Sequence, residues 1–295
     1  MRRLLITGAN GQVGRALAGL AAGDGFEAIA LGRDGLDIAD RAAVLETVAS
    51  SGALAVINAA AFTAVDAAEG RRDEALAINR DGPAFLAEAC ARAAIPLIHV
   101  STDYVFDGEK KAPYVEDDPV NPLSVYGASK EAGERAVRER LGAHLIVRTS
   151  WVYDATGQNF VRTMLRLGAE RDRLTIVDDQ WGAPTAAPDL ARALLTATAR
   201  LLDAPSAERF GTFHHSGGGA TTWYRFAKAI FAHAAAAGRK VPAELVPIPT
   251  SDYPTPARRP ADGRLDCGRF TACFGVAPVA WEDALARMMT SILAV

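Results

Sequence analysis

A tyrosine and a lysine stand four residues apart in the stretch Val125–Lys130, and their side chains could transfer protons. If this stretch begins a helix, Tyr126 and Lys130 share one face, with Cβ atoms about 5–6 Å apart. A free tyrosine has a pKa of about 10. A neighbouring ammonium favours the phenolate, so we expect Lys130 to lower the pKa of Tyr126 toward neutrality. The alternative is a surface tyrosine that precedes a lysine by chance.

A glycine-rich turn lies at the start of the chain. The apolar strand predicted at Leu4–Ile6 runs into Gly8–Gly14, and a helix is expected to continue to about Ala22. The glycines permit a tight turn, and they let backbone N–H groups approach a pyrophosphate at the helix N-terminus. The spacing is G-x-x-G-x-x-G rather than G-x-G-x-x-G, so the strand, turn and helix around it carry much of the prediction.

The second predicted strand, Phe26–Leu31, is followed by Gly32 and Arg33. Many dinucleotide-binding sheets have a carboxylate here for the ribose 2′-hydroxyl, whereas an arginine suits a 2′-phosphate. The sequence therefore predicts NADPH as the preferred cofactor, with NADH as the other possibility. A solvated surface arginine is the competing interpretation.

Strands and helices alternate regularly over the first half of the chain. This order predicts an α/β fold, a doubly wound parallel sheet of the Rossmann type. Ligands of such sheets sit beyond the carboxyl ends of the strands, and Thr102 and Asp103 follow the fourth predicted strand. The alternation loosens after Ser150. We therefore expect a dinucleotide-binding domain over 1–150, to which roughly 174–215 return, and a smaller, interleaved substrate-binding lobe over 151–295.

Composition sets limits on the class of protein. Apolar residues make up 49% of the chain, charged residues 23%, and the formal net charge is −3, which suits a globular protein and favours neither nucleic acid nor an anionic membrane as a partner. The three cysteines and five histidines lack the spacing of a metal site or disulfide framework, so no metal is predicted. No apolar run reaches membrane-spanning length, and the first is too short for a signal peptide, so we expect a cytoplasmic protein.

Taken together, the turn, a threonine at a strand end and Tyr-x-x-x-Lys resemble the short-chain dehydrogenase/reductase superfamily. The length resembles its extended branch, which acts mainly on nucleotide sugars, and the sequence is similar to the dTDP-4-dehydrorhamnose reductases within it. The segments that carry the resemblance run in order along nearly the whole chain: Gly8–Gly14, Asn58–Ala61, Thr63–Asp66, Ala68–Glu69, Ser101–Phe106, Pro122–Lys130, Arg148–Tyr153, Asp179–Gln180, Gly182, Pro184–Thr185, Tyr253–Pro256 and Arg259–Pro260.

The resemblance implies roles for individual residues. Tyr126 would give a proton to the developing alkoxide as hydride arrives from NAD(P)H, Lys130 would support Tyr126 and contact the nicotinamide ribose, and Thr102 would stabilise the carbonyl oxygen. The implied cofactor-binding set also contains Gly8, Asn10, Gly11, Gln12, Val13, Gly14, Arg33, Asp37, Ile38, Ala60, Ala61, Phe62 and Thr63. The implied substrate-binding set is Thr102, Asp103, Tyr104, Trp151 and Arg259.

The chain departs from the family pattern at several positions. Phe62 replaces a polar residue or histidine, and Asp262-Gly263 stands where an Asn-Ser pair is expected. Some members dimerise through magnesium held by glutamates, but Arg15 occupies the first helix and the last turn, Thr290–Val295, has no acid. A monomer or weak homodimer is therefore predicted rather than a metal-bridged dimer. Asn79 is interpreted as a surface or structural residue, with support of a water near Lys130 as the alternative.

The leading functional hypothesis is reduction of the 4-keto group of dTDP-4-dehydro-L-rhamnose to dTDP-L-rhamnose. One alternative is another nucleotide-sugar epimerase or dehydratase of the superfamily, although dehydratases usually add acidic residues and no glutamate follows Asp103. The other is a non-catalytic NADP-binding regulatory subunit, for which binding alone would not require Tyr126, Lys130 and Thr102 together.

Overall fold

The structure is a computed structural model that describes residues 1–293. Its centre is a six-stranded sheet in the order β10-β5-β4-β3-β1-β2, and every neighbouring pair of strands is parallel. This arrangement confirms the predicted doubly wound Rossmann-type fold. The strands are β1 (Arg2–Thr7), β2 (Phe26–Leu31), β3 (Ala55–Asn58), β4 (Leu97–Thr102), β5 (His144–Thr149) and β10 (Gly211–His214).

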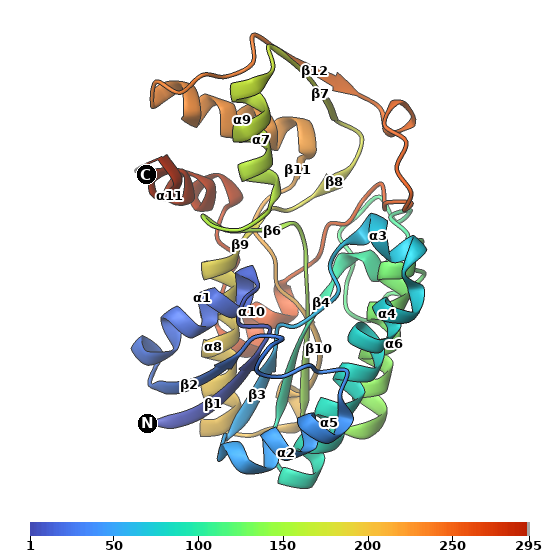
Figure 1. Cartoon of the computed structure of the whole chain (residues 1–295), viewed down its shortest axis with the longest axis vertical. Coiled ribbons are helices and arrows are strands. Elements are labelled where there is room, and N and C mark those ends of the chain that lie inside the picture. The colour runs from blue at the N-terminus through green and yellow to red at the C-terminus, as the bar shows by residue number, and fades with distance from the viewer. Residues whose placement is uncertain (294–295) are drawn as a thin grey trace.

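Helices cover both faces of this sheet (Figure 1). Because side chains alternate along a strand, Leu4 and Ile6 point into one apolar cluster and Leu5 into the other. The first cluster is completed by α1 (Gln12–Leu20), α8 (Ala187–Asp203) and α10 (Gly268–Phe274). The second is completed by α2 (Arg41–Ser51), α5 (Gly82–Ala93) and α6 (Val125–Arg140).

A smaller C-terminal lobe stands over one end of the sheet, as predicted (Figure 1). Its own core gathers around Phe226, Ile230 and Trp281. The helices of the lobe are α7 (Phe160–Glu170), α9 (Trp223–Ala236) and α11 (Trp281–Leu293). Its strands form three short pairs: β7 (Arg173–Val177) with β12 (Glu244–Ile248), β8 (Trp181–Gly182) with β11 (Thr221–Thr222), and β6 (Val152–Tyr153) with β9 (Thr185–Ala186).

The chain crosses between the two parts more than once. Strand β10 and helix α8 lie with the large sheet, whereas β7 pairs with β12 in the lobe. The predicted division into domains stays a prediction. Residues 294 and 295, with which the predicted lobe and last turn end, lie outside the described residues. Within residues 1–293, no helix is both long and apolar enough to cross a membrane.

The helical segment over 72–93 is interrupted. It begins as α4 (Arg72–Leu76), widens into a π-helical turn, η2 (Ala77–Asp81), and continues as α5. Pro83, at the start of α5, has no N–H to donate to the preceding turn, which favours a break there. The remaining elements are α3 (Val65–Gly70), which was not predicted, and the short 3₁₀ turns η1 (Ala21–Asp24), η3 (Asp103–Val105), η4 (Ala207–Arg209) and η5 (Thr250–Asp252).

Candidate active site

The glycine-rich turn between β1 and α1 has the geometry of an anion cradle. Gly8 has a φ of +70°, and a Cβ placed on it would lie 2.5 Å from the backbone nitrogen of Ala60. A Cβ on Gly14 would lie 2.1 Å from the carbonyl oxygen of Gly8. Helix α1 begins after Gly11 without a side-chain cap, so its first N–H groups remain available to a ligand. These features fit a dinucleotide pyrophosphate at the turn.

The turn also contacts the C-terminal lobe. The side chain of Gln12 donates to the carbonyl oxygen of Val152 at 3.5 Å and accepts from Nδ2 of Asn159 at 3.1 Å. Asn10 is exposed, and Val13 packs against the apolar core behind the turn. Gln12 therefore joins the predicted cofactor turn to the lobe that was predicted to hold the substrate.

The other predicted cofactor residues differ in how far they are exposed. Arg33 is exposed and faces Asp37 across 3.7 Å at the end of β2, where a ribose phosphate could reach it. Ile38, by contrast, is buried in the core. Beyond β3, Phe62 is buried and Thr63 is exposed. Ala60 and Ala61, half-buried beside the Gly8 turn, complete this set.

Helix α6 brings Tyr126 and Lys130 against the end of β4. Its first turn is capped by Ser124, whose hydroxyl accepts from the N–H of Gly127 at 3.1 Å. A Cβ on Gly127 would lie 2.2 Å from the carbonyl oxygen of Tyr104, so only glycine permits this close approach. The rings of Tyr104 and Tyr126 meet edge to face at 5.5 Å. The structure therefore brings the predicted pair on α6 to Thr102.

The electrostatics of Tyr126 differ from the sequence prediction. Burial raises its pKa to about 12, and a hydrogen bond with Thr102 offsets part of that rise. The expected lowering by Lys130 is therefore wrong, because desolvation of the phenol dominates. The ammonium of Lys130 donates to the carbonyl oxygen of Val100 at 2.8 Å, and burial lowers its pKa to about 8. At neutral pH Tyr126 holds its proton, as a proton donor requires.

Thr102 and Asp103 form the floor of the site at the end of β4. The Thr102 hydroxyl donates to Asp103 Oδ1 at 3.0 Å, and it accepts from the N–H of Tyr104 at 3.2 Å. Burial raises the pKa of Asp103 to about 7. Gly263 lies against the Asp103 carboxylate, since a Cβ there would be 2.5 Å from Oδ2. The Asp-Gly sequence that departs from the family pattern thus contacts the predicted substrate site.

The C-terminal lobe supplies the other predicted substrate residues. Trp151 has a φ of +47° and stacks on Trp223, with ring centroids 3.5 Å apart. Trp223 therefore covers one face of the Trp151 indole, and Gly182 also packs against this ring, since a Cβ there would lie 2.4 Å from Cε2. The Trp151 side chain as a whole is half-buried. Arg259 donates to Asp66 Oδ2 at 2.8 Å and also bonds Thr255. This ion pair ties the lobe to α3.

Asn79 supports the site from behind. It is buried, so the surface interpretation is wrong and the structural one is correct. Its Oδ1 accepts from the N–H of Phe62 at 2.8 Å, and its Nδ2 donates to the Phe62 carbonyl at 3.0 Å and to the Ser129 hydroxyl at 2.9 Å. Asn79 therefore links the predicted cofactor segment to α6.

Sequence reasoning missed three supporting residues: Glu69, Ser129 and Trp223. Glu69 accepts from the N–H of Val125 at 2.9 Å, at the start of the helix that carries Tyr126. Its place within a matching family segment was the only signal available. The prediction that no metal is bound stays a prediction. Over residues 1–293, no three His, Cys, Asp or Glu side chains are grouped to hold an ion.

Comparison with known proteins agrees with this geometry over the full length. The chain is 45% identical to a dTDP-4-dehydrorhamnose reductase of Sinorhizobium fredii, over 99% of this chain and 98% of that protein. It is 40% identical to the Escherichia coli enzyme of the same name, covering 98% and 97%.

Two solved structures of proteins with that name match closely. One, from Clostridium acetobutylicum, has a TM-score of 0.90 and 39% identity over 98% of this chain and 99% of that one. The other, from Bacillus anthracis and in complex with NADP, has a TM-score of 0.90 and 35% identity over 99% and 100%. The model of the RmlD substrate binding domain family matches residues 1–294. The chain therefore belongs to this family, which confirms the resemblance that its motifs indicated.

Proposed function

We propose that this protein reduces the 4-keto group of dTDP-4-dehydro-L-rhamnose to give dTDP-L-rhamnose, using NAD(P)H. The observation that carries the proposal is the packing of α6 against the end of β4, where Lys130 donates to the Val100 carbonyl at 2.8 Å and the ring of Tyr126 meets that of Tyr104 at 5.5 Å. This packing supports a site in which the protonated phenol of Tyr126 and the hydroxyl of Thr102 would meet one carbonyl oxygen. The relatives named above, which share 35–45% of their residues with this chain, support the choice of substrate.

NADPH is the proposed cofactor, and it supplies the hydride when bound. The uncapped start of α1 and the Gly8–Gly14 turn would hold its pyrophosphate. Arg33 would contact the 2′-phosphate. The NADP complex of the Bacillus anthracis relative supports this assignment. Asn10, Gly11, Gln12, Val13, Asp37, Ile38, Ala60, Ala61, Phe62 and Thr63 complete the proposed cofactor-binding set, together with Tyr126 and Lys130.

The proton transfer is assigned to Tyr126. As the C4 carbonyl carbon gains a hydride, its oxygen becomes an alkoxide and takes the phenolic proton. The Thr102 hydroxyl turns from Asp103 Oδ1 to donate a hydrogen bond to the same oxygen and stabilises its growing charge. Lys130, held by the Val100 carbonyl, places a positive charge on this face of α6 and opposes the negative charge left on Tyr126. Water then returns a proton to the tyrosinate.

Substrate positioning is assigned to Asp103, Tyr104, Trp151 and Arg259. Asp103 and Tyr104 adjoin Thr102, so they would contact the sugar ring near the reacting carbon. The uncovered part of the Trp151 indole suits the C–H surface of a sugar. The guanidinium of Arg259 suits phosphate oxygens, which can replace or share its contact with Asp66. We further propose that the protein acts in the cytoplasm as a monomer or weak homodimer.

Turnover distinguishes this function from its alternatives. The protein is incubated with NADPH and dTDP-4-dehydro-L-rhamnose made in situ, and NADPH loss and the product are followed together. We expect one NADPH consumed per dTDP-L-rhamnose formed. An epimerase would change the sugar without net NADPH consumption, and a regulatory subunit would leave both unchanged. A solved UDP-glucose 4-epimerase of Brucella ovis, 20% identical with a TM-score of 0.80, shows only that the fold is shared.

A further inference from the structure

A buried carboxylate continues the face of α6 that carries the proposed catalytic pair. Tyr126, Lys130 and Glu134 are successive members of an i, i+4 series, so they lie along one side of the helix. Glu134 is 0% exposed. The proposed chemistry gives it no role, yet burying a carboxylate is costly unless its oxygens are satisfied.

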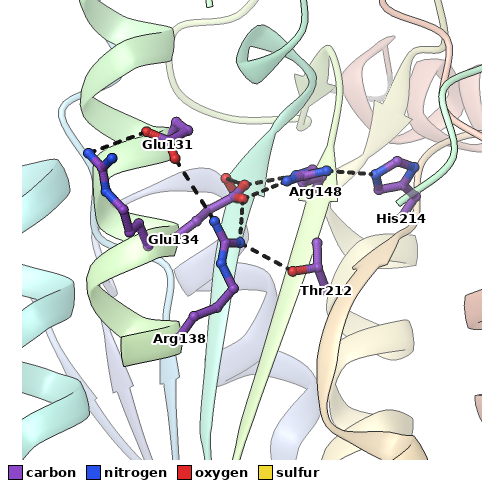
Figure 2. A network of polar contacts seen from close by, with 8 residues as sticks. Glu131, Glu134, Arg138, Arg148, Thr212 and His214 are labelled. Carbon is purple, nitrogen blue, oxygen red and sulfur yellow. Dashed lines mark hydrogen bonds and ion pairs between the residues drawn. The ribbon is translucent and has the colours of Figure 1, made fainter. Parts of the chain in front are cut away.

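Both oxygens of Glu134 are fully satisfied (Figure 2). Oε1 accepts from the Ser101 hydroxyl at 2.6 Å and from Nε of Arg148 at 2.9 Å. Oε2 accepts from Nη2 of Arg148 at 2.7 Å and from Nη1 of Arg138 at 3.0 Å. Arg148, which is 3% exposed, also lies 3.4 Å from Nε2 of His214. The network therefore joins α6 to strands β4, β5 and β10.

Two side chains of this face bond consecutive residues of β4. Lys130 donates to the carbonyl of Val100 at 2.8 Å, and Glu134 accepts from the hydroxyl of Ser101 at 2.6 Å. Tyr126 lies one turn earlier and meets the ring of Tyr104, two residues after Thr102. A small shift of α6 along β4 would break both hydrogen bonds and move Tyr126 away from the end of β4.

We propose that Glu134 is a positioning residue for the reduction. Its carboxylate holds the Tyr126 face of α6 in register with β4, and its charge cancels that of Arg148 so that Lys130 remains an ammonium. The inference rests on the proposed roles of Tyr126 and Lys130. A purely structural buried ion pair is the competing explanation, because such pairs are common and contribute little net stability.

The charges around Lys130 support this reading. Burial lowers the pKa of Lys130, and Glu134 acts against that lowering. Without the Glu134 carboxylate, Arg148 would be a buried positive charge without its carboxylate partner, beside the face of α6 that carries Lys130. That charge disfavours the ammonium of Lys130 and favours the phenolate of Tyr126. Both groups would then lose their protons at lower pH.

Other titratable groups near this face do not produce the same alkaline behaviour. Burial holds the pKa of His99 and that of His214 below the usual range for histidine, as it does for His144. The pKa of Asp103 is about 7, so this group affects the acid side of a pH profile. Burial raises the pKa of Tyr104 above the range in question. The alkaline limb therefore reports Lys130 and Tyr126.

The test compares pH profiles of kcat for the wild-type protein and Glu134→Gln, with NADPH and the nucleotide sugar saturating. Glutamine keeps the size of the side chain and removes its charge. We expect the alkaline limb to move about one pH unit lower, a shift typical of a lost neighbouring counter-charge. KM for the nucleotide sugar should change less than kcat. Coincident alkaline limbs, with only a lower melting temperature, would overturn the inference.

Three further variants make the result specific. Glu131→Gln is the matched control, because Glu131 lies on the same helix but pairs only loosely, at 3.7 Å with Arg135 and 4.0 Å with Arg138, so its limb should stay in place. The double variant Glu134→Gln with Arg148→Met should return the limb toward wild type, since no uncompensated charge remains. If the double variant keeps the full shift, charge cancellation is excluded. If Glu134→Gln does not fold, the variant Arg138→Gln provides the test instead. Its alkaline limb should move slightly to higher pH, because one positive charge beside Glu134 is removed. An alkaline limb at the wild-type position would contradict the inference.

The proposed function and this inference fail in different ways. If Tyr126→Phe retains wild-type turnover, the proposed chemistry is wrong whatever Glu134 does. If Tyr126→Phe is inactive while Glu134→Gln has the wild-type pH profile, only the role of Glu134 is wrong.

Discussion

The cofactor side and the substrate side of the proposed active site are built differently. On the cofactor side, the backbone itself forms the proposed pyrophosphate site. Gly8 and Gly14 pack so closely that neither position has room for a Cβ. On the substrate side, the site is assembled from side chains of separate segments, such as Trp151 on Trp223 and Arg259 on Asp66. A single added carbon should therefore damage the cofactor side more than the loss of a whole functional group damages the substrate side.

The largest binding effect is expected for Gly14→Ala. The new Cβ would meet the Gly8 carbonyl at 2.1 Å, so the turn must move. The N–H groups at the start of α1 would then no longer point at the pyrophosphate. We expect NADPH affinity to fall about 100-fold, equivalent to two or three lost charge-assisted hydrogen bonds. Gly19→Ala is the matched control, because it lies on the same helix with nothing within 4 Å of its Cβ. Titration of NADPH binding measures both, and equal dissociation constants would refute the backbone argument.

A smaller effect is expected for Arg259→Gln on the substrate side. The variant removes the cation proposed for the diphosphate and the ion pair with Asp66. KM for the nucleotide sugar should rise about tenfold, the value of one hydrogen bond to a charged group, while kcat changes less. Arg258→Gln, at the exposed neighbouring position, is the control. If KM is unchanged in both variants, Arg259 only ties the lobe to α3.

The smallest effect is expected for Arg33→Ser. Arg33 is well exposed, so its contact with a 2′-phosphate is screened by water. The ratio of kcat/KM for NADPH to that for NADH should fall about three- to tenfold, roughly one exposed charge contact. The value for NADH serves as the internal reference, because NADH has no 2′-phosphate. A ratio equal to that of the wild type would leave Arg33 as a surface residue.

The contrast between local backbone geometry and side-chain contacts across distant segments also explains which features the sequence could predict. The parallel sheet, the Gly8–Gly14 turn and the position of Thr102 follow from local patterns, because each lies within or directly after one strand. The proximity of Tyr126 and Lys130 also follows from helical spacing. Their electrostatics do not, since the pKa of Tyr126 depends on burial by segments far away in sequence.

Several contacts that the sequence could not predict depend on long-range packing. The sequence shows that Glu134 follows Lys130 by four residues. It does not show that the partner of Glu134 is Arg148 on β5, or that both are buried once the sheet is assembled. Trp223 is separated from Trp151 by six strands and two α-helices. Asn79 sits in a π-helical turn that no spacing rule indicated, and only the fold shows that it faces Phe62 and Ser129.

The central claim, that Tyr126 supplies the proton for a carbonyl reduction, is tested most directly by Tyr126→Phe. The substitution removes one hydroxyl and leaves the ring that packs against Tyr104. Single-turnover oxidation of bound NADPH by dTDP-4-dehydro-L-rhamnose should slow by about 100- to 10,000-fold, the usual contribution of a general acid, while NADPH binding stays close to wild type. A single-turnover rate equal to that of the wild-type protein would contradict the account.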